Sequence, residues 1–104
     1  MQFLSRIEEI LLLAIWKLDD NAYGIAIREQ VEKDTGVKWL SGAIYGPLSR
    51  LRKNGYVKIN MDEQGNDQRG RPRIYYTLTP VGKEKLQAIQ MLNRVMWANI
   101  PDVK

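Results

Sequence analysis

The sequence contains no cysteine and no histidine, and these two absences exclude several classes of protein at once. A chain without cysteine forms no disulfide and has no thiolate nucleophile, and the lack of both residues removes nearly every kind of zinc site. A serine nucleophile would lack the imidazole partner that usually activates it. We therefore expect this chain not to be an enzyme and to hold no metal or other cofactor.

Long apolar runs are also missing. The longest, Ile10 to Trp16, is far shorter than the roughly 18–20 residues that cross a membrane. The first residues do not follow the charged, then apolar, then small pattern of a signal peptide. A length of 104 residues fits one domain with a single modest core. These observations predict a cytoplasmic location.

The positive charge is concentrated in the middle of the chain. The whole sequence has 16 Lys and Arg against 12 Asp and Glu, a net charge of +4. Residues 38–85 hold ten of the basic residues and four of the acidic ones, whereas residues 1–37 are net acidic. This clustering favours an anionic partner, and nucleic acid is the class that such an excess fits best. A basic surface that is simply solvated remains the alternative.

The periodicity of apolar residues predicts four helices and two strands. Helical spacing and capping residues place the helices at 6–18, 23–35, 42–54 and 80–98, with Ser41 as the N-cap of the third helix. Alternating and β-branched residues predict strands at 56–61 and 74–78, joined by a polar tip at 62–70. This order predicts an α+β, mainly helical fold, a winged helix-turn-helix. Residues 1–79 would form the DNA-binding part, and residues 80–104 a long C-terminal dimerisation helix packed on the first helix.

The predicted helix at 42–54 has one apolar face, formed by Ile44, Leu48 and Leu51. Its other face is small or hydrogen-bonding at the start and basic toward the end, which suits a helix that enters the major groove of DNA. The candidate DNA-binding residues of this helix are Ser41, Gly42, Ala43, Tyr45, Ser49, Arg50 and Lys53. An ordinary amphipathic helix with a solvated face is the alternative.

A second candidate for DNA contact is the run Arg69-Gly70-Arg71-Pro72-Arg73. Glycine and proline between the arginines keep the backbone extended and the guanidinium groups apart, which suits insertion into the minor groove or binding of phosphates. We expect Arg69, Arg71 and Arg73 to serve a wing in this way. The alternative is that Pro72 blocks edge pairing at the hairpin and that the arginines aid solubility.

The first and last predicted helices carry more apolar surface than a chain of this size can bury. We therefore expect a homodimer in which these helices pack against those of a partner, which would place the two recognition helices ~34 Å apart. The seam could also accept a small aromatic ligand. The residues expected there are Leu12, Trp16, Ile89, Leu92, Met96 and Trp97. An oversized monomeric core, or a winged-helix module that binds protein instead of DNA, are the alternatives.

Several motifs resemble the PadR family of bacterial transcriptional regulators over roughly residues 7–86. They are Tyr23-Gly24-Ile25-Ala26-Ile27, Ser41-Gly42-Ala43-Ile44-Tyr45, Leu48-Ser49-Arg50-Leu51, Asn54-Gly55-Tyr56-Val57, Gly70-Arg71-Pro72-Arg73 and Tyr75-Tyr76-Thr77-Leu78-Thr79-Pro80. The resemblance implies a homodimeric repressor that binds palindromic double-stranded operators. It also implies dimer contacts through the C-terminal helix and release of the DNA by small molecules, often phenolic or drug-like.

The chain departs from the family pattern in two places. Tyr45-Gly46-Pro47 stands where the family commonly has a Tyr-Pro pair, and a single helix follows the wing where longer members carry a further helical domain. The chain therefore resembles the short type of the family.

Overall fold

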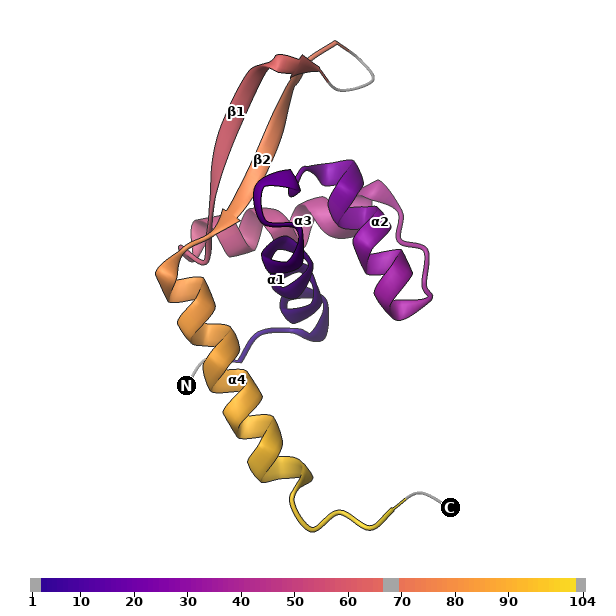
Figure 1. The fold of residues 1–104 in the computed structure, drawn as a ribbon, viewed down its shortest axis with the longest axis vertical. Coiled ribbons are helices and arrows are strands. Elements are labelled where there is room, and N and C mark those ends of the chain that lie inside the picture. Colours follow the sequence, from indigo (N-terminus) through magenta and orange to yellow (C-terminus); the bar gives the residue numbers. More distant parts are fainter. Residues whose placement is uncertain (1–2, 67–69, 103–104) are drawn as a thin grey trace.

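The structure is a computed structural model that describes residues 3–66 and 70–102. Its elements follow the predicted order (Figure 1). They are α1 (Arg6–Leu18), the short 3-10 helix η1 (Asp19–Asn21), α2 (Gly24–Thr35), α3 (Ser41–Lys53), β1 (Val57–Asn66), β2 (Pro72–Leu78) and α4 (Pro80–Trp97). The α+β, mainly helical winged helix-turn-helix expected from the sequence is confirmed.

The ends of three helices are formed by the capping groups expected from the sequence. At the start of α1, Ser5 Oγ accepts a hydrogen bond from Glu8 N at 3.2 Å, and the Glu8 carboxylate accepts one from Ser5 N at 2.9 Å. Gly36 ends α2 in the left-handed conformation, with φ at 74°. Thr79 Oγ1 accepts a hydrogen bond from Gly82 N at the start of α4. The predicted helix limits are therefore confirmed to within one residue.

Ser41 does not act as the N-cap that the sequence predicted. The helix α3 begins at Ser41 itself, and Leu40 occupies the cap position without a side-chain hydrogen bond. The hydroxyl of Ser41 instead accepts a hydrogen bond from Arg28 Nη1 on α2. The side chain is thus used to join two helices and is not available to cap one of them.

The helix α1 lies at the centre of the molecule, where it contacts α2, α3, α4 and β2 (Figure 1). Leu11, Leu12 and Ile15 are all buried in the core of the single chain, with Leu12 completely so (0% exposed). The expectation that Leu12 lies on an uncovered side and reaches a partner chain is therefore wrong. A helix that is packed from several directions buries a wider arc than a surface helix does.

The wing is an antiparallel hairpin that is longer than the sequence predicted. Regular pairing runs from Val57 opposite Leu78 to Asp62 opposite Arg73, and after a shift in register Asn66 lies opposite Pro72. The predicted strand limits of 61 and 74 are therefore wrong, since both strands extend into or toward the segment 62–70 that was predicted as the tip. Residues 67–69 of that segment lie outside the described residues. A two-stranded ribbon is held by backbone hydrogen bonds, so polar side chains do not end it, and a bulge accommodates the extra residues.

The base of the wing is bonded to the residues just before α2 and just after α3. On one side, Tyr76 N donates a hydrogen bond to Ala22 O at 2.7 Å, and Tyr23 forms an isolated bridge with Tyr75. On the other, Thr79 N donates to Tyr56 O and Thr79 Oγ1 to Gly55 O, at 3.0 and 2.6 Å. These bonds join the end of α3, the wing and the start of α4 into one unit.

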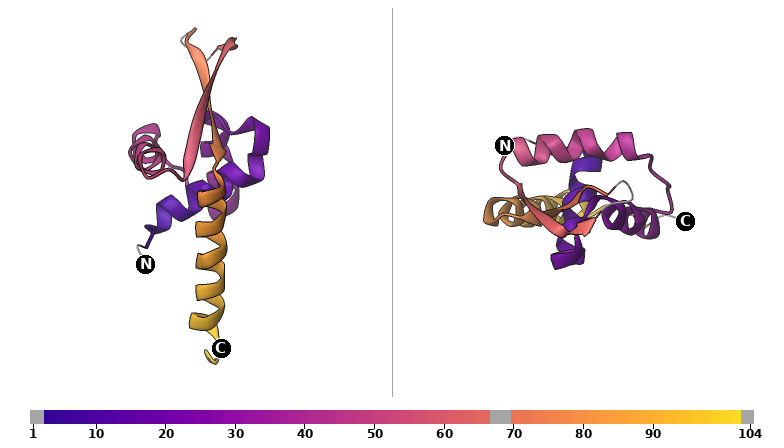
Figure 2. Two further views of the ribbon diagram at one scale, coloured as in Figure 1. Left: turned by 90° about the vertical axis from the view of Figure 1, so that its left-hand side faces the viewer. Right: turned by 90° about the horizontal axis from the view of Figure 1, so that it is seen from above.

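The molecule measures 52 × 30 × 21 Å, and the far end of α4 projects away from the rest of it (Figure 2). Leu86 and Ile89 of α4 are buried, whereas Met91, Val95, Met96 and Trp97, nearer its end, are largely exposed. Within the described part of the chain, no helix is both long and apolar enough to span a bilayer.

Candidate nucleic-acid interface

The helix α3 presents a polar and basic face to the solvent. Ile44, Leu48 and Leu51 are fully buried, as the sequence predicted. The outer face is formed by exposed residues, which are Gly42, Ala43, Tyr45, Gly46, Ser49, Arg50 and Lys53. The helix contains no acidic residue, and Arg50, Arg52 and Lys53 lie in its last turn. Such a surface suits a negatively charged partner.

The outer face of α3 is open at its start. A Cβ atom built on Gly42 would meet nothing within 4 Å, and one built on Gly46 would meet only the Arg50 guanidinium, at 3.8 Å. The backbone of the first turns is therefore accessible to a groove without an intervening side chain.

Tyr45 lies across the gap between α3 and the start of α2. A Cβ atom added to Gly24 would lie 2.6 Å from the Tyr45 hydroxyl oxygen, so a larger residue would displace the tip of this side chain. Tyr45 is nevertheless 48% exposed. The side chain can thus fix the angle between the two helices and still present part of its ring at the surface.

Arg28 is a candidate interface residue that the sequence reasoning missed. It lies on α2, and its guanidinium donates to Ser41 Oγ at the first turn of α3. This bond brings a positive charge beside the end of the helix that would approach base edges. Arg28 belongs to the net acidic segment 1–37, so the cluster of positive charge in residues 38–85 does not indicate it.

The three arginines predicted for the wing have different surroundings. Arg71 is exposed at the outer end of the hairpin, next to Gly70 with φ at 77°. Arg73 is half-buried, and its guanidinium lies over the Tyr23 ring, 4.5 Å from the ring centroid. A hydrogen bond with Tyr75 raises the pKa of Arg73 and so favours its charged form. Arg69 lies outside the described residues.

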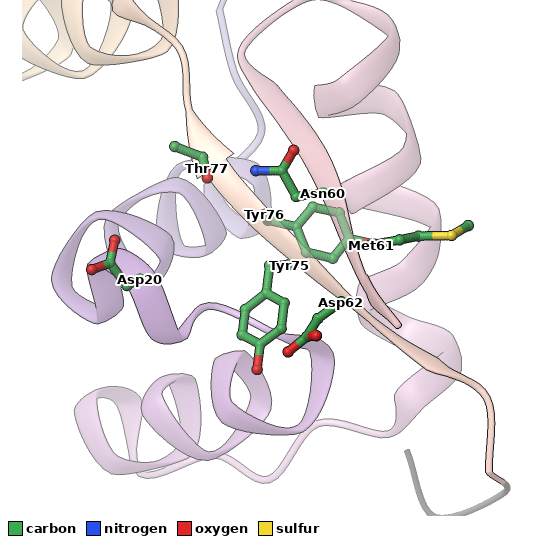
Figure 3. Close-up of a pocket in the computed structure, with 7 residues that line it drawn as sticks. All are labelled: Asp20, Asn60, Met61, Asp62, Tyr75, Tyr76 and Thr77. Atoms are coloured by element: carbon green, nitrogen blue, oxygen red, sulfur yellow. The ribbon is translucent and has the colours of Figure 1, made fainter. Parts of the chain in front are cut away.

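The two faces of the hairpin are chemically distinct, because residues alternate along each strand. Tyr75 leaves β2 on the side of Asp62, whereas Tyr76 leaves it on the side of Met61 (Figure 3). Burial raises the pKa of Tyr76. Among its charged or ionisable neighbours, Tyr45 adds to this rise and Arg52 opposes it, and both lie on α3. The Tyr76 face of the hairpin is therefore the one turned toward α3.

A shallow, open hollow lies at the wing. It is lined by Asp20, Asn60, Met61, Asp62, Tyr75, Tyr76 and Thr77 (Figure 3). None of the residues predicted to bind an aromatic ligand lines it. Among the described residues, no group of three or more acidic, cysteine or histidine side chains is placed to hold a metal ion.

The residues predicted for the dimer seam do not form one continuous surface on the single chain. Leu12 lies in the core and Ile89 is 9% exposed, while Leu92 is half-buried. Trp16 is 39% exposed, with Lys83 Nζ 5.7 Å from its ring centroid. Met96 and Trp97 are 65% and 71% exposed at the projecting end of α4. An apolar surface thus remains, centred on α4.

Three packed helices, an outward-facing third helix and a hairpin beside it define the class of winged helix-turn-helix proteins. Residues 12–88 match the transcriptional regulator PadR-like family. The chain belongs to this family, whose members are transcription regulators and not enzymes.

Solved structures share the fold. A PadR family transcription regulator from hypervirulent Clostridium difficile is 26% identical, with a TM-score of 0.72, over 88% of this chain and 91% of that one. A PadR-like transcription factor from Bacteroides fragilis is 23% identical, with a TM-score of 0.73, over 86% and 82%. RosR of H. salinarum is 21% identical, with a TM-score of 0.74, over 97% and 84%. Among curated proteins, none matches this sequence.

Proposed function

We propose that this chain is a sequence-specific, double-stranded DNA-binding regulator that acts in the cytoplasm as a homodimeric repressor. The observation that carries this proposal is the outer face of α3, which is open at its start, free of acidic residues and basic at its end. The arginine-bearing hairpin beside it gives a second basic element (Figure 1). Membership of a family of transcription regulators supports the same conclusion.

In this proposal the first turns of α3 read base edges in the major groove. Gly42 and Ala43 allow close approach, and Ser49 and Arg50 supply hydrogen bonds to bases or adjacent phosphates. Lys53, near the end of the helix, neutralises phosphate. Ser41 and Tyr45 complete the groove-facing set, and Arg71 and Arg69 would extend the contact through the wing.

The proposed dimer uses the exposed apolar end of α4. Met91, Val95, Met96 and Trp97 lie in the last two turns of α4 and are largely exposed in the described part of the chain. A second copy is the occupant that fits best, because two-fold symmetry would present two α3 helices to successive turns of DNA. A palindromic operator follows from that symmetry.

We also propose that a small aromatic effector binds at this seam and releases the DNA. Trp16, Met96 and Trp97 offer flat or adaptable apolar side chains, and two copies would be needed to enclose a ligand. Quenching of tryptophan fluorescence by a panel of phenolic compounds tests this step. Quenching should disappear in Trp97→Ala, and DNA that stays bound at saturating compound would contradict it.

Selection of bound duplexes from a random pool, followed by titration, tests the main proposal. We expect a palindromic consensus whose half-sites are one helical turn apart. Ser49→Ala should alter the preference among sequences, whereas Arg71→Ala should weaken binding to all of them. Arg6→Ala is the matched control, since Arg6 lies at the start of α1 and pairs with Glu9. A pool from which no salt-sensitive duplex is recovered at micromolar protein would contradict the proposal.

The second candidate function is a module that binds another protein through the exposed end of α4. The same apolar residues favour it, so the oligomeric state separates the two. Light scattering that shows a stable monomer, together with no DNA complex, would favour this alternative.

A further inference from the structure

Arg73, Tyr23 and Tyr75 form a stack at the point where the wing crosses the start of α2. The Arg73 guanidinium lies 4.5 Å from the centroid of the Tyr23 ring. The Tyr23 and Tyr75 rings meet edge to face, 5.5 Å apart and inclined by 67°. Both geometries are attractive arrangements for a cation on an aromatic face and for two aromatic rings. The stack therefore joins a residue near the start of α2 to two residues of β2.

Backbone bonds lie directly beneath this stack. Tyr23 pairs with Tyr75 as an isolated bridge, and Tyr76 N donates to Ala22 O at 2.7 Å. Beyond this point the hairpin extends past the helices (Figure 1). The direction of the outer hairpin is thus set at this crossing.

Arg73 and Arg71 are two residues apart and differ in exposure. Arg71 is exposed, whereas Arg73 is half-buried on Tyr23 and lies opposite Asp62 in the register of the hairpin. The two side chains therefore do not have equal access to a DNA backbone, although the sequence presents them as equivalent.

We propose that Arg73 is a positioning residue, which holds the wing against the start of α2 and so fixes its direction relative to α3, and is not a DNA contact. This inference rests on the proposed function and assigns separate roles to the arginines of the wing. Arg71 supplies charge to the DNA, and Arg73 determines where that charge lies.

The neighbour of Tyr23 gives this assignment a further consequence. Tyr23 receives Arg73 on its ring, and the next residue, Gly24, receives the Tyr45 hydroxyl of α3. Two consecutive residues thus serve as the shared anchor of the wing and the recognition helix. Displacing this anchor should change the placement of both elements.

The salt dependence of DNA binding separates a positioning residue from a phosphate contact. Log K falls as log salt rises, and each lost phosphate contact makes this negative slope shallower by about 0.9. The probe is a duplex that the wild-type chain recovers from a random pool. We expect Arg71→Ala to make the slope shallower by about this amount per subunit. Arg73→Ala should keep the wild-type slope and weaken affinity about 3- to 30-fold, because the loosened wing still makes the Arg71 contact once it is ordered on the DNA.

Variants of Tyr23 provide the matched controls. Tyr23→Leu removes the ring and should resemble Arg73→Ala, whereas Tyr23→Phe keeps the ring and should bind as the wild type does. The double variant Arg73→Ala with Tyr23→Leu should lose less affinity than the sum of the two single losses, because both substitutions remove the contact of Arg73 with the Tyr23 ring. A salt slope that becomes shallower in Arg73→Ala by as much as in Arg71→Ala would overturn the proposal. Wild-type affinity in Tyr23→Leu would overturn it as well.

Hydrogen exchange of the free protein tests the same contact without DNA. We expect faster exchange of the Tyr76 amide in Arg73→Ala and Tyr23→Leu, and unchanged exchange in Arg71→Ala and Tyr23→Phe. If the wild-type chain binds no duplex, the proposed function fails while this measurement still decides the role of Arg73. Unchanged exchange at Tyr76 in Arg73→Ala would overturn the positioning role.

Discussion

Three glycines at helix positions in this chain fall into two kinds, as the neighbours of the missing Cβ show. At Gly24 the space is taken by the Tyr45 hydroxyl, and at Gly82 by the carbonyl oxygen of Tyr56. At Gly42 nothing lies within 4 Å. Packing within the chain therefore accounts for the first two glycines, and at the third the space is open to an outside partner.

This difference predicts opposite effects of one substitution on stability and on binding. Gly42→Ala should stabilise the free protein by about 0.5–1 kcal/mol, because alanine loses less conformational entropy in a helix. The same methyl group would stand on the groove-facing surface and should weaken DNA binding. Urea unfolding and DNA titration of the one variant check both effects. Binding equal to that of the wild type would remove Gly42 from the interface.

Tyr76 predicts a dependence of stability on alkaline pH. Burial raises its pKa in the folded chain above the value of about 10 that it has when unfolded. The free energy that this difference contributes is complete below about pH 10 and is lost as the pH rises further, because the unfolded chain then ionises first. Urea unfolding between pH 9 and about pH 11 should therefore show a smaller loss in Tyr76→Phe than in the wild type. An equal loss in both proteins would contradict this role.

Individual residues divide into those that the sequence could place and those that it could not. The inward face of α3 was predicted because periodicity alone determines it. Leu12 was placed wrongly, since the number of neighbours around α1 is a property of the whole fold. The stack of Arg73 on Tyr23 joins residues that are far apart in the sequence, and no local pattern indicates such a contact.

At the scale of elements, the caps made the helices predictable. Ser5 with Glu8, and Thr79 with Pro80, mark helix starts through bonds between near neighbours. The length of the hairpin was not predictable in this way, because pairing between Asn66 and Pro72 depends on the partner strand and not on apolar side chains.

The junction between the wing and α4 gives a prediction for the packing of elements. A Cβ atom at Gly82 would lie 2.3 Å from Tyr56 O. The backbone at Tyr56 and the backbone at Gly82 are both held by hydrogen bonds to Thr79, so neither can move aside easily. Gly82→Ala should therefore destabilise the chain by about 1–3 kcal/mol, since the start of α4 must move. Urea unfolding measures this, with Gly42→Ala as the control at an open helix position. A Gly82→Ala variant as stable as the wild type would contradict this prediction, since it would show that the start of α4 can shift without loss of stability.

The whole molecule has a compact part and a projecting part, and substitutions in the two should act differently. Leu12→Ala should lower the free energy of unfolding by about 2–5 kcal/mol, because Leu12 is completely buried in the single chain. Trp97→Ala should leave the helical content unchanged and convert the proposed dimer to a monomer. Circular dichroism and light scattering distinguish the two results. A Trp97→Ala variant that remains dimeric would place the interface elsewhere.

Nuclear magnetic resonance of the labelled chain during addition of duplex DNA tests the central claim most directly. The claim is that α3 and the wing form one DNA-facing surface, with the projecting end of α4 on a separate part of the molecule (Figure 2). We predict that the changes in amide chemical shift concentrate in Ser41–Lys53 and around Gly70 and Arg71. The amide signals of residues 91–98 should not change. Shifts that concentrate on α4, or a spectrum that DNA does not change, would contradict it.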